Sequence, residues 1–278
     1  MKISAVILTK NEEKNIQRAL KSVDFCDEII IIDDYSTDNT LKKLKTQNSK
    51  VKIFKRELNL DFSQQRNFGM GKCKNNWILF IDADEEVSNE LQKEIVSLFH
   101  NSSDKPPLKS PPYQGGEKGE VAYYIKRRDF FWDKELKYGE IRKIRQMGLI
   151  RLIKKNSGKW KGKVHEIYKL KTQSSNVKTL ENYLNHYPHP NLKDFLEKIN
   201  FYSTLRAKEL AEQKRKTNIL EIIFFPLGKF FYTYFFKLGF LDGPQGFVYA
   251  FFMSFHSFLV RTKLYQYSKI ANNYDEML

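Results

Sequence analysis

Short runs of apolar residues alternate with helical patterns through the first hundred residues of the chain. The runs at 3–9, 28–32, 51–54 and 77–81 are mostly apolar without a break, which is typical of strands buried on both faces of a parallel sheet. Between them lie a helix that opens at 11–13, a second with Leu41 and Leu44 inward, a third over 62–73 and a fourth over 88–99. Strands that alternate with helices predict an α/β fold, with a parallel-rich sheet flanked by helices.

The pattern changes twice after residue 100. Residues 101–120 hold four of the eight prolines and three glycines, so we expect a flexible surface insertion there. Residues 121–190 are basic and alternate like strands, and the run HYPHP at 186–190 predicts a turn. From residue 191 the apolar spacing is helical. We therefore expect an α/β half over 1–100, the insertion, a second half over 121–190, and a helical region over 191–278.

The segment 219–260 is unusually rich in Phe and Tyr. Its three apolar blocks are interrupted by Lys229, Lys237, Asp242 and Pro244, and the longest block falls short of the roughly 20 residues that a membrane-spanning helix needs. Mixed aromatic and basic residues suit helices that lie in the membrane interface. A core helix hairpin or an oligomer interface is the alternative. We favour the membrane surface because the aromatic content exceeds what one small core should bury.

Charge and cysteine content narrow the class of protein. The chain has 278 residues and a net charge of +15, so we expect a phosphate-bearing partner: nucleic acid, anionic lipid or a nucleotide. Cys26 and Cys73 form neither a disulfide framework nor a metal-ligand spacing, as in a cytosolic protein with reduced thiols. The N-terminal apolar run ends in charges and lacks the features of a signal peptide.

Polar clusters follow three of the predicted strands. Asp82 and Asp84 are two residues apart and point to the same side if the strand persists that far. Two neighbouring carboxylates repel each other unless a cation lies between them, and their hard oxygens suit Mg²⁺ or Mn²⁺. A solvated acidic turn before a helix is the alternative. Residues 9–12 and 33–34 belong to the same predicted edge, where such sheets bind ligands.

No glycine-rich phosphate loop accompanies these clusters. The chain has no Gly-x-Gly-x-x-Gly after its first strand and no Gly-Lys-Ser/Thr motif. If this edge binds phosphate, metal and side chains must replace the glycine loop.

Two stretches of the basic region carry further candidate chemistry. Arg151 lies among apolar residues, and from the sequence alone a solvated strand face is the simpler interpretation. His165 and Glu166 place an imidazole beside a carboxylate, for which a solvated strand edge is likewise simpler. His186 and His189 would need more ligands at closer spacing to form a zinc site.

Seven pieces of the sequence, taken in order, resemble the family 2 glycosyltransferases with the GT-A fold. The chain is most similar to the branch that includes lipopolysaccharide core glucosyltransferases of the bacterial inner-membrane face. The pieces are ILTKNEE (7–13), IIDDYSTDNT (31–40), FSQQRNFG (62–69), WILFIDADEEV (77–87), RLIKK (151–155), KVHEIY (163–168) and FLDGPQGFVYAFF (240–252).

The resemblance implies roles for particular residues. It makes Asp82 and Asp84 the metal motif, with Asp84 favoured as the direct ligand, and Glu166 the catalytic base. The implied substrate-binding residues are Thr9, Asn11 and Glu12 in the nucleotide site, Asp33 or Asp34 at the base, Arg66 at the diphosphate or sugar, and also Asp82, Arg151 and, near the acceptor, His165. Tyr35 departs from many relatives, which have a small residue there.

The resemblance also implies a reaction. We expect inverting transfer of a sugar from a nucleotide sugar, with UDP-sugar as the expected donor, to a lipid-linked or lipopolysaccharide-type glycan. A divalent Mn²⁺ or Mg²⁺ would stabilise the leaving diphosphate, and a carboxylate would take the acceptor proton. The enzyme would be cytoplasmic and peripheral on the inner face of the cytoplasmic membrane, bound to its anionic surface.

Two other functions remain as alternatives. A polyprenyl-phosphate sugar synthase of the same fold would share the donor site but use a lipid phosphate as acceptor. A nucleic-acid binder would use the charge of +15, but it would leave the acidic clusters unexplained. We therefore expect no nucleic-acid partner.

Overall fold

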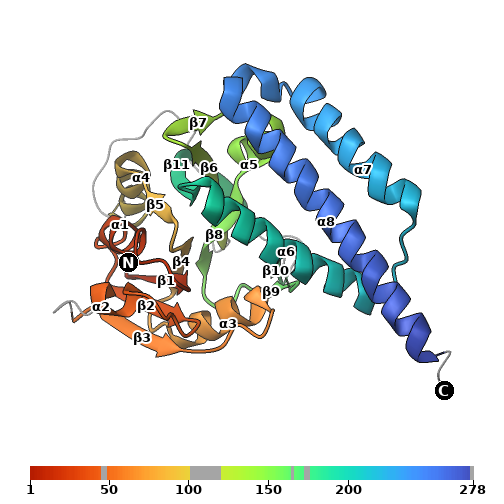
Figure 1. Ribbon diagram of the computed structural model, residues 1–278. Helices are drawn as coiled ribbons and strands as arrows, with labels where there is room; N and C mark the ends of the chain where they lie inside the picture. Colours follow the sequence, from red (N-terminus) through yellow and green to blue (C-terminus); the bar gives the residue numbers. More distant parts are fainter. Residues whose placement is uncertain (45–48, 101–119, 164–165, 172–175, 276–278) are drawn as a thin grey trace. The chain divides into compact units, whose positions relative to one another are not determined.

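The computed structural model describes residues 1–44, 49–100, 120–163, 166–171 and 176–275 (Figure 1). The chain forms two compact units, one of residues 1–128 and 146–186 and one of residues 129–145 and 187–278. All but the last residue of the predicted 101–120 insertion lies outside the described residues. The insertion and the predicted domain boundaries therefore stay predictions.

The first unit is built on a largely parallel sheet. Its parallel strands are β1 (Ile3–Thr9), β2 (Glu28–Asp33), β3 (Val51–Lys55) and β4 (Trp77–Asp82). The sheet continues through β8 (Leu149–Lys154), β6 (Ala122–Phe131), β11 (Val177–His189) and the short β5 (Glu85–Val87). The strand order is β3-β2-β1-β4-β8-β6-β11-β5, and the pairs β4–β8, β8–β6 and β11–β5 are antiparallel. The predicted α/β class with a parallel-rich sheet is confirmed.

The helices of this unit follow the predicted alternation. They are α1 (Ile16–Ser22), α2 (Thr40–Leu44), α3 (Phe62–Lys72) and α4 (Asn89–His100), and a separate antiparallel pair joins β9 (Gly158–Lys161) to β10 (Ile167–Leu170). Helix α1 begins later than predicted, because the Glu12 carbonyl first closes a turn by accepting from the Asn15 and Ile16 N–H groups. Gly69 lets α3 approach the sheet, since a Cβ there would lie 2.6 Å from Val6.

Both faces of the sheet are buried in separate hydrophobic clusters. Val6, Ile30 and Phe80 belong to one cluster, whereas Ile7 and Ile31 belong to the other. Because successive residues of a strand point to opposite faces, both faces require apolar side chains. This arrangement explains the unbroken apolar runs of the parallel strands. The two cysteines are buried, and burial raises the pKa of the Cys73 thiol to about 12.

The second unit is mostly helical. Its first complete element is β7 (Lys134–Leu136), which pairs with the end of β6. The short helices η1 (Gly139–Ile141) and α5 (Arg142–Met147) follow, and α5 is shared with the first unit. The remaining elements are α6 (Leu192–Glu212), α7 (Ile219–Phe231), the π-helical turn η2 (Tyr232–Phe236), η3 (Gly239–Asp242) and α8 (Gly243–Asp275). Helix α8 packs against both α6 and α7 (Figure 1). A cluster that includes Phe131 and Phe195 forms the core of the unit.

Three local predictions were wrong. The stretch HYPHP is no turn up to His189: β11 stays extended to that residue because strand pairing, with His186 opposite Glu85, outweighs the preference of Pro188. Helix α5 interrupts a region predicted to be β-rich. Pro226 and Lys229 do not break α7, so Ile219–Phe236 is the one helical segment of the described chain long and apolar enough to cross a membrane.

Candidate active site

The predicted polar clusters meet at one edge of the sheet. In the register of the parallel strands Thr9 lies opposite Asp33, and Leu8, just before Thr9, lies opposite Asp82. The three polar residues therefore end neighbouring strands at the carboxyl edge, where parallel sheets bind ligands.

The loops after β1 and β2 are tied together by hydrogen bonds. The Asn11 N–H donates to Ser36 Oγ at 2.9 Å, and Asn11 Oδ1 accepts from the Thr37 N–H at 2.8 Å. The Glu12 N–H donates to Thr40 Oγ1 at 2.8 Å. Asn11, through its backbone and side chain, and Glu12, through its backbone, thus fix the two loops to each other. The ring of Tyr35, in a left-handed backbone conformation, is 56% exposed on the loop after β2.

The two neighbouring acids at the end of β2 differ in their contacts. Asp34 Oδ2 accepts from Lys10 Nζ at 2.7 Å, and Asp34 Oδ1 accepts from the Leu58 N–H at 3.1 Å. Asp33 Oδ2 accepts from the Ser36 N–H at 3.1 Å, but Asp33 Oδ1 is buried and has no hydrogen-bond partner among the described residues. The same holds for Thr9 Oγ1. Unpaired buried acceptors are uncommon, so these two oxygens are suited to a ligand.

Two arginines hold the carboxylate of Asp82. Arg66 Nη2 donates to Asp82 Oδ1 at 2.8 Å and to Oδ2 at 3.1 Å, and Arg151 Nη2 donates to Oδ2 at 2.8 Å. Arg151 is only 4% exposed, so its interpretation as part of a solvated strand face was wrong. The reason is that β8 pairs with β4, which brings Arg151 beside the acidic cluster.

Glu85 completes this cluster and was not singled out from the sequence. Its buried carboxylate accepts from the Asp82 N–H at 2.9 Å, from Arg151 Nη2 at 2.8 Å and from Arg127 Nη1 at 3.5 Å. Its place in the acidic run was visible, but its partners come from strands far along the chain.

The charges of these groups are fixed by their neighbours. Burial alone would raise the pKa of the Asp82 carboxyl, but the positive charges of Arg151 and Arg66 outweigh burial and hold this pKa well below its usual range. Burial opposes the charge of Arg151, but Asp82 and Glu85 raise the pKa of its guanidinium further above its usual range. The Asp82 carboxylate and the Arg151 guanidinium are therefore both charged at neutral pH.

Arg66 also links Asp82 of the predicted metal motif to the predicted base. Its Nε donates to Glu166 Oε1 at 2.8 Å, and its guanidinium carbon lies 5.0 Å from the centre of the Trp160 ring. Glu166 is mostly buried in this pair, so it is not on a solvated strand edge. His165 lies outside the described residues, and its role stays a prediction.

Asp84 has a different neighbour from Asp82. Its Oδ1 lies 3.7 Å from His186 Nε2, on the strand β11. Within the described ranges no three His, Cys, Asp or Glu side chains are grouped to hold a metal ion. Mg²⁺ commonly takes one or two carboxylates and completes its shell with water and substrate phosphates. Asp84 fits that kind of site, whereas both oxygens of Asp82 already accept from arginines.

Comparisons with known proteins identify the family of the chain. The model of the glycosyl transferase family 2 matches residues 4–151. The chain is 31% identical to an uncharacterized glycosyltransferase of Rickettsia typhi, over 98% of this chain and 89% of that protein. It is 27% identical to the lipopolysaccharide core biosynthesis glycosyltransferase LpsC of Rhizobium meliloti, over 95% of this chain and 92% of that protein.

A solved structure supports the fold. The mannosyltransferase PcManGT from Pyrobaculum calidifontis, solved with GDP-Man and Mn²⁺, superposes with a TM-score of 0.55 at 10% identity, covering 95% of this chain and 86% of that chain. The fold class expected from the sequence, of the GT-A type, is thereby confirmed. The family model spans more than half of the chain, from β1 into β8. The chain therefore belongs to glycosyltransferase family 2 and is a glycosyltransferase.

Proposed function

We propose that the enzyme transfers a sugar, with inversion, from a UDP-sugar to a lipid-linked or lipopolysaccharide-type glycan. The observation that carries the proposal is the cluster of Arg66, Asp82, Arg151 and Glu166, beside Asp84, at the carboxyl edge of a family 2 sheet. The name of the relative LpsC, a lipopolysaccharide core glycosyltransferase, supports the acceptor class. We assign donor binding to residues 1–100 and acceptor binding to residues 121–190.

The donor nucleoside would bind between the loops after β1 and β2. Asp33 Oδ1 and Thr9 Oγ1, both buried and unpaired among the described residues, would accept hydrogen bonds from the base or ribose. Asn11 and Glu12 shape the wall of this pocket. The diphosphate would lie against Arg66, whose Nη1 is likewise buried without a partner in the described chain. Such preorganised cations stabilise the charge that develops on the leaving diphosphate.

A divalent cation, Mn²⁺ or Mg²⁺, would be held by Asp84, with His186 as its neighbour and the donor phosphates as further ligands. When bound, it would supply positive charge to the departing diphosphate. In this arrangement Asp82 orients the turn between β4 and β5, because Arg66 and Arg151 fix its carboxylate.

Glu166 would take the proton of the acceptor hydroxyl. Its Oε1 accepts from Arg66 Nε, which keeps the carboxylate in place, and Oε2 makes no hydrogen bond to the described residues. Oε2 is therefore the atom that would accept the proton, once the hydroxyl lies within hydrogen-bond reach. His165 would lie beside the same acceptor.

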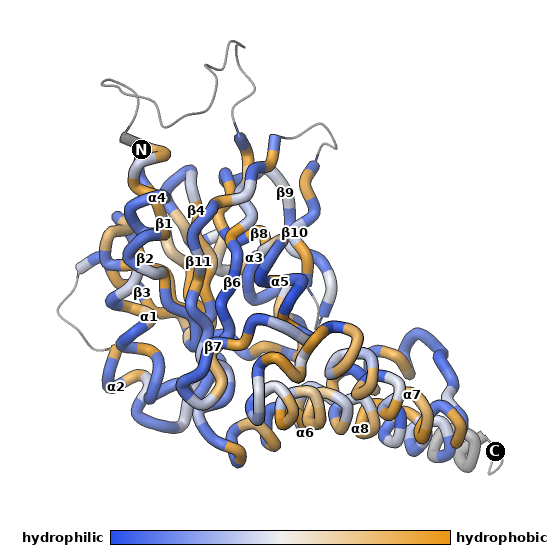
Figure 2. Tube along the Cα trace, turned by 90° about the horizontal axis from the view of Figure 1, so that it is seen from above, coloured by the Kyte–Doolittle hydropathy of each residue, from blue (hydrophilic) through white to orange (hydrophobic). Residues whose placement is uncertain are grey.

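The second unit would hold the enzyme on the inner face of the cytoplasmic membrane. Large apolar side chains are exposed along α7 and η2, among them Phe224 at 61% and Phe236 at 78%. Figure 2 shows hydrophobic residues along both α7 and α8. An exposed apolar surface of this kind marks a contact with protein or membrane. We assign it to the membrane because the proposed acceptors are lipid-linked.

The test is a transfer assay with the full-length enzyme. A panel of UDP- and GDP-sugars is offered with lipopolysaccharide core acceptors, and in parallel with polyprenyl phosphate, with Mn²⁺ or with a chelator. We expect transfer from a UDP-sugar to the glycan acceptor, with inverted anomeric configuration and loss of turnover in the chelator. Transfer to polyprenyl phosphate alone would favour the synthase, and retention of configuration would overturn the mechanism.

A further inference from the structure

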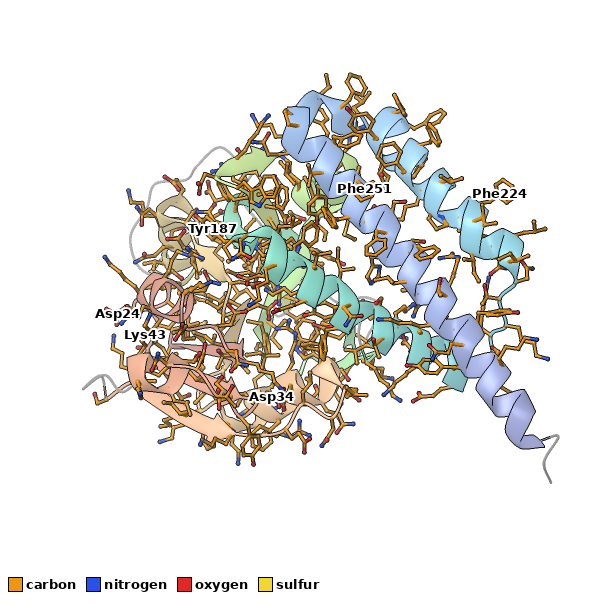
Figure 3. The ribbon with its side chains drawn as sticks, in the orientation of Figure 1. Asp24, Asp34, Lys43, Tyr187, Phe224 and Phe251 are labelled. Carbon is orange, nitrogen blue, oxygen red and sulfur yellow. The ribbon has the colours of Figure 1, made fainter. Side chains whose placement is uncertain are left out.

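A narrow apolar groove runs between α7 and α8 in the second unit. It encloses about 340 Å³ and is lined by Ile223, Pro226 and Leu227 of α7 and by Phe251, Phe255 and Phe258 of α8. Figure 3 marks Phe251 on α8 and Phe224 on the outer side of α7. The groove has the volume of a small ligand site, and its walls bear aliphatic and aromatic side chains.

The single hydroxyl in the wall of the groove is already engaged. Ser254 Oγ donates to the Pro226 carbonyl at 2.6 Å. An incoming ligand would therefore contact hydrocarbon surface. Water would find few hydrogen-bond partners in such a site, so it gains little free energy by filling it. The groove favours an unbranched apolar chain over a polar ligand.

A cation lies next to one end of this groove. Arg261 follows Phe258 by one helical turn, and its guanidinium carbon lies 3.9 Å from the centre of the Phe225 ring on α7. Its Nη1 donates to Ser257 Oγ at 2.8 Å, while its Nε is buried without a hydrogen-bond partner among the described residues.

No described acidic side chain forms an ion pair with Arg261. Glu221, an acid on α7, lies 3.8 Å from Arg215, and its negative charge also acts on Arg261 without forming an ion pair with it. Lys263, two residues further along α8, donates to Asn200 and Thr204 of α6. The guanidinium of Arg261 is thus a positive charge that a phosphate could neutralise.

We infer that this groove binds one anionic phospholipid, with an acyl chain along Pro226 and Phe255 and the phosphate at Arg261. The inference rests on the membrane part of the proposed function and goes beyond it, because it replaces general interfacial adhesion with one stoichiometric lipid site. The apolar walls match the chain, and the unpaired cation matches the phosphate. If the groove received a second protein chain, it would not need an unpaired cation beside its apolar walls.

The test uses the full-length protein and dihexanoyl-phosphatidylglycerol below its micelle concentration, with stoichiometry read by native mass spectrometry and affinity by titration. Wild type should bind one lipid saturably. Ile223→Trp, which fills the groove, should weaken binding about tenfold, as expected when roughly two methylene groups are no longer buried. Leu220→Trp is the matched control, because Leu220 is exposed on the same helix but does not line the groove.

A second variant tests the phosphate contact. Arg261→Gln should weaken binding of the phospholipid about tenfold, in the range of a lost charge-assisted contact. It should leave binding of monomeric octyl glucoside, a neutral single-chain probe, unchanged, whereas Ile223→Trp should weaken both. Equal thermal unfolding temperatures would show that the variants are folded.

Separate vesicle binding keeps the two proposals distinguishable. Full-length protein that binds phosphatidylglycerol vesicles but no monomeric lipid, or an Ile223→Trp variant with wild-type affinity, would overturn the lipid site and leave membrane association standing. Failure to bind vesicles would overturn both. A dimer that Ile223→Trp dissociates would show instead that the groove receives a second copy of the chain.

Discussion

One nitrogen of Arg151, Nη2, donates to both Asp82 and Glu85, at 2.8 Å in each case. Glu85 has no exposed surface and Arg151 almost none. Within a buried network, removal of one charge leaves the others without compensation. Arg151 therefore supports the fold at the same point where it orients Asp82 of the proposed metal motif.

Arg151→Gln should lower the free energy of unfolding by about 3–5 kcal/mol, because it leaves the buried Glu85 with the Asp82 N–H and, as a positive charge, the more distant Arg127. Urea unfolding followed by circular dichroism measures this change. Lys154→Gln, an exposed charge on the same strand, should change the free energy of unfolding by less than about 0.5 kcal/mol. If the Arg151 variant is as stable as this control, the network is not energetically coupled.

The parallel half of the fold could be predicted from the sequence, because strands that are buried on both faces are apolar at nearly every position. Residues 28–32 are apolar at every position but Glu28, and they make up all of β2 except its last residue, Asp33. The same logic placed Thr9, Asp33 and Asp82 at one edge, since parallel strands end together. These are consequences of local pattern and need no knowledge of distant contacts.

The partners of the acidic cluster could not be read in this way. Arg66, Arg151 and His186 reach it from a helix and from strands whose pairing is set by long-range packing. The sequence separation between Arg66 and Glu166 is 100 residues. In addition, the sequence pattern around a buried arginine in a strand is the same as that around an exposed one, so the two cannot be told apart until the carboxylate partners are known. The resemblance to a family, and not the local pattern, brought Arg66 and Arg151 into the predicted site.

Asp33→Asn and Asp34→Asn should differ clearly in their effect on UDP binding. Asp33→Asn replaces the unpaired Oδ1 by a donor, so it should weaken UDP binding by about tenfold or more while the loop stays folded. Asp34→Asn weakens the contact with Lys10, a partly exposed ion pair, and should leave UDP affinity within about twofold. Isothermal titration with UDP measures both. The reverse order of effects would assign the base contact to Asp34.

Asp84→Asn should abolish metal-dependent transfer and leave the unfolding temperature unchanged, because it removes a ligand charge with little change of shape. Transfer by the wild type should stop in excess chelator and return with Mn²⁺. Glu86→Gln is the control, since Glu86 is a carboxylate two residues further along, and its Oε2 accepts from Asn185 Nδ2 at 3.3 Å. Normal turnover of the Asp84 variant, or full activity in chelator, would rule out the metal assignment.

Glu166→Gln should lower turnover by about 10² or more, as expected for loss of a general base, and leave donor affinity unchanged. The amide oxygen can still accept from Arg66, so the position of that arginine is preserved. Glu120→Gln removes a carboxylate that pairs with Lys178 and should have no effect on turnover. Near-normal turnover of the Glu166 variant would move the role of base to another carboxylate.

The proposed membrane surface is best tested by point substitutions, because α8, which follows residue 215, is also part of the core of the second unit. Asp242 accepts from the Lys137 and Tyr138 N–H groups, and α8 covers the core around Phe195, so removal of the tail would unfold the second unit. Among the basic residues of this region, Lys229 pairs with Glu140 and Lys263 donates to Asn200 of α6. The proposed contact with anionic lipid therefore rests on Lys237 and Arg261.

We therefore expect a triple Ser variant of Phe224, Phe231 and Phe236 to be released from membranes while its donor affinity is unchanged. All three rings are more than half exposed, so their loss removes surface that could enter the interface at little cost to the fold. Fractionation with high-salt and alkaline washes checks this, with Tyr35→Ser as an exposed aromatic control in the first unit. Wild type that survives alkaline wash, with its C-terminus protected from cytoplasmic protease, would show that Ile219–Phe236 crosses the bilayer.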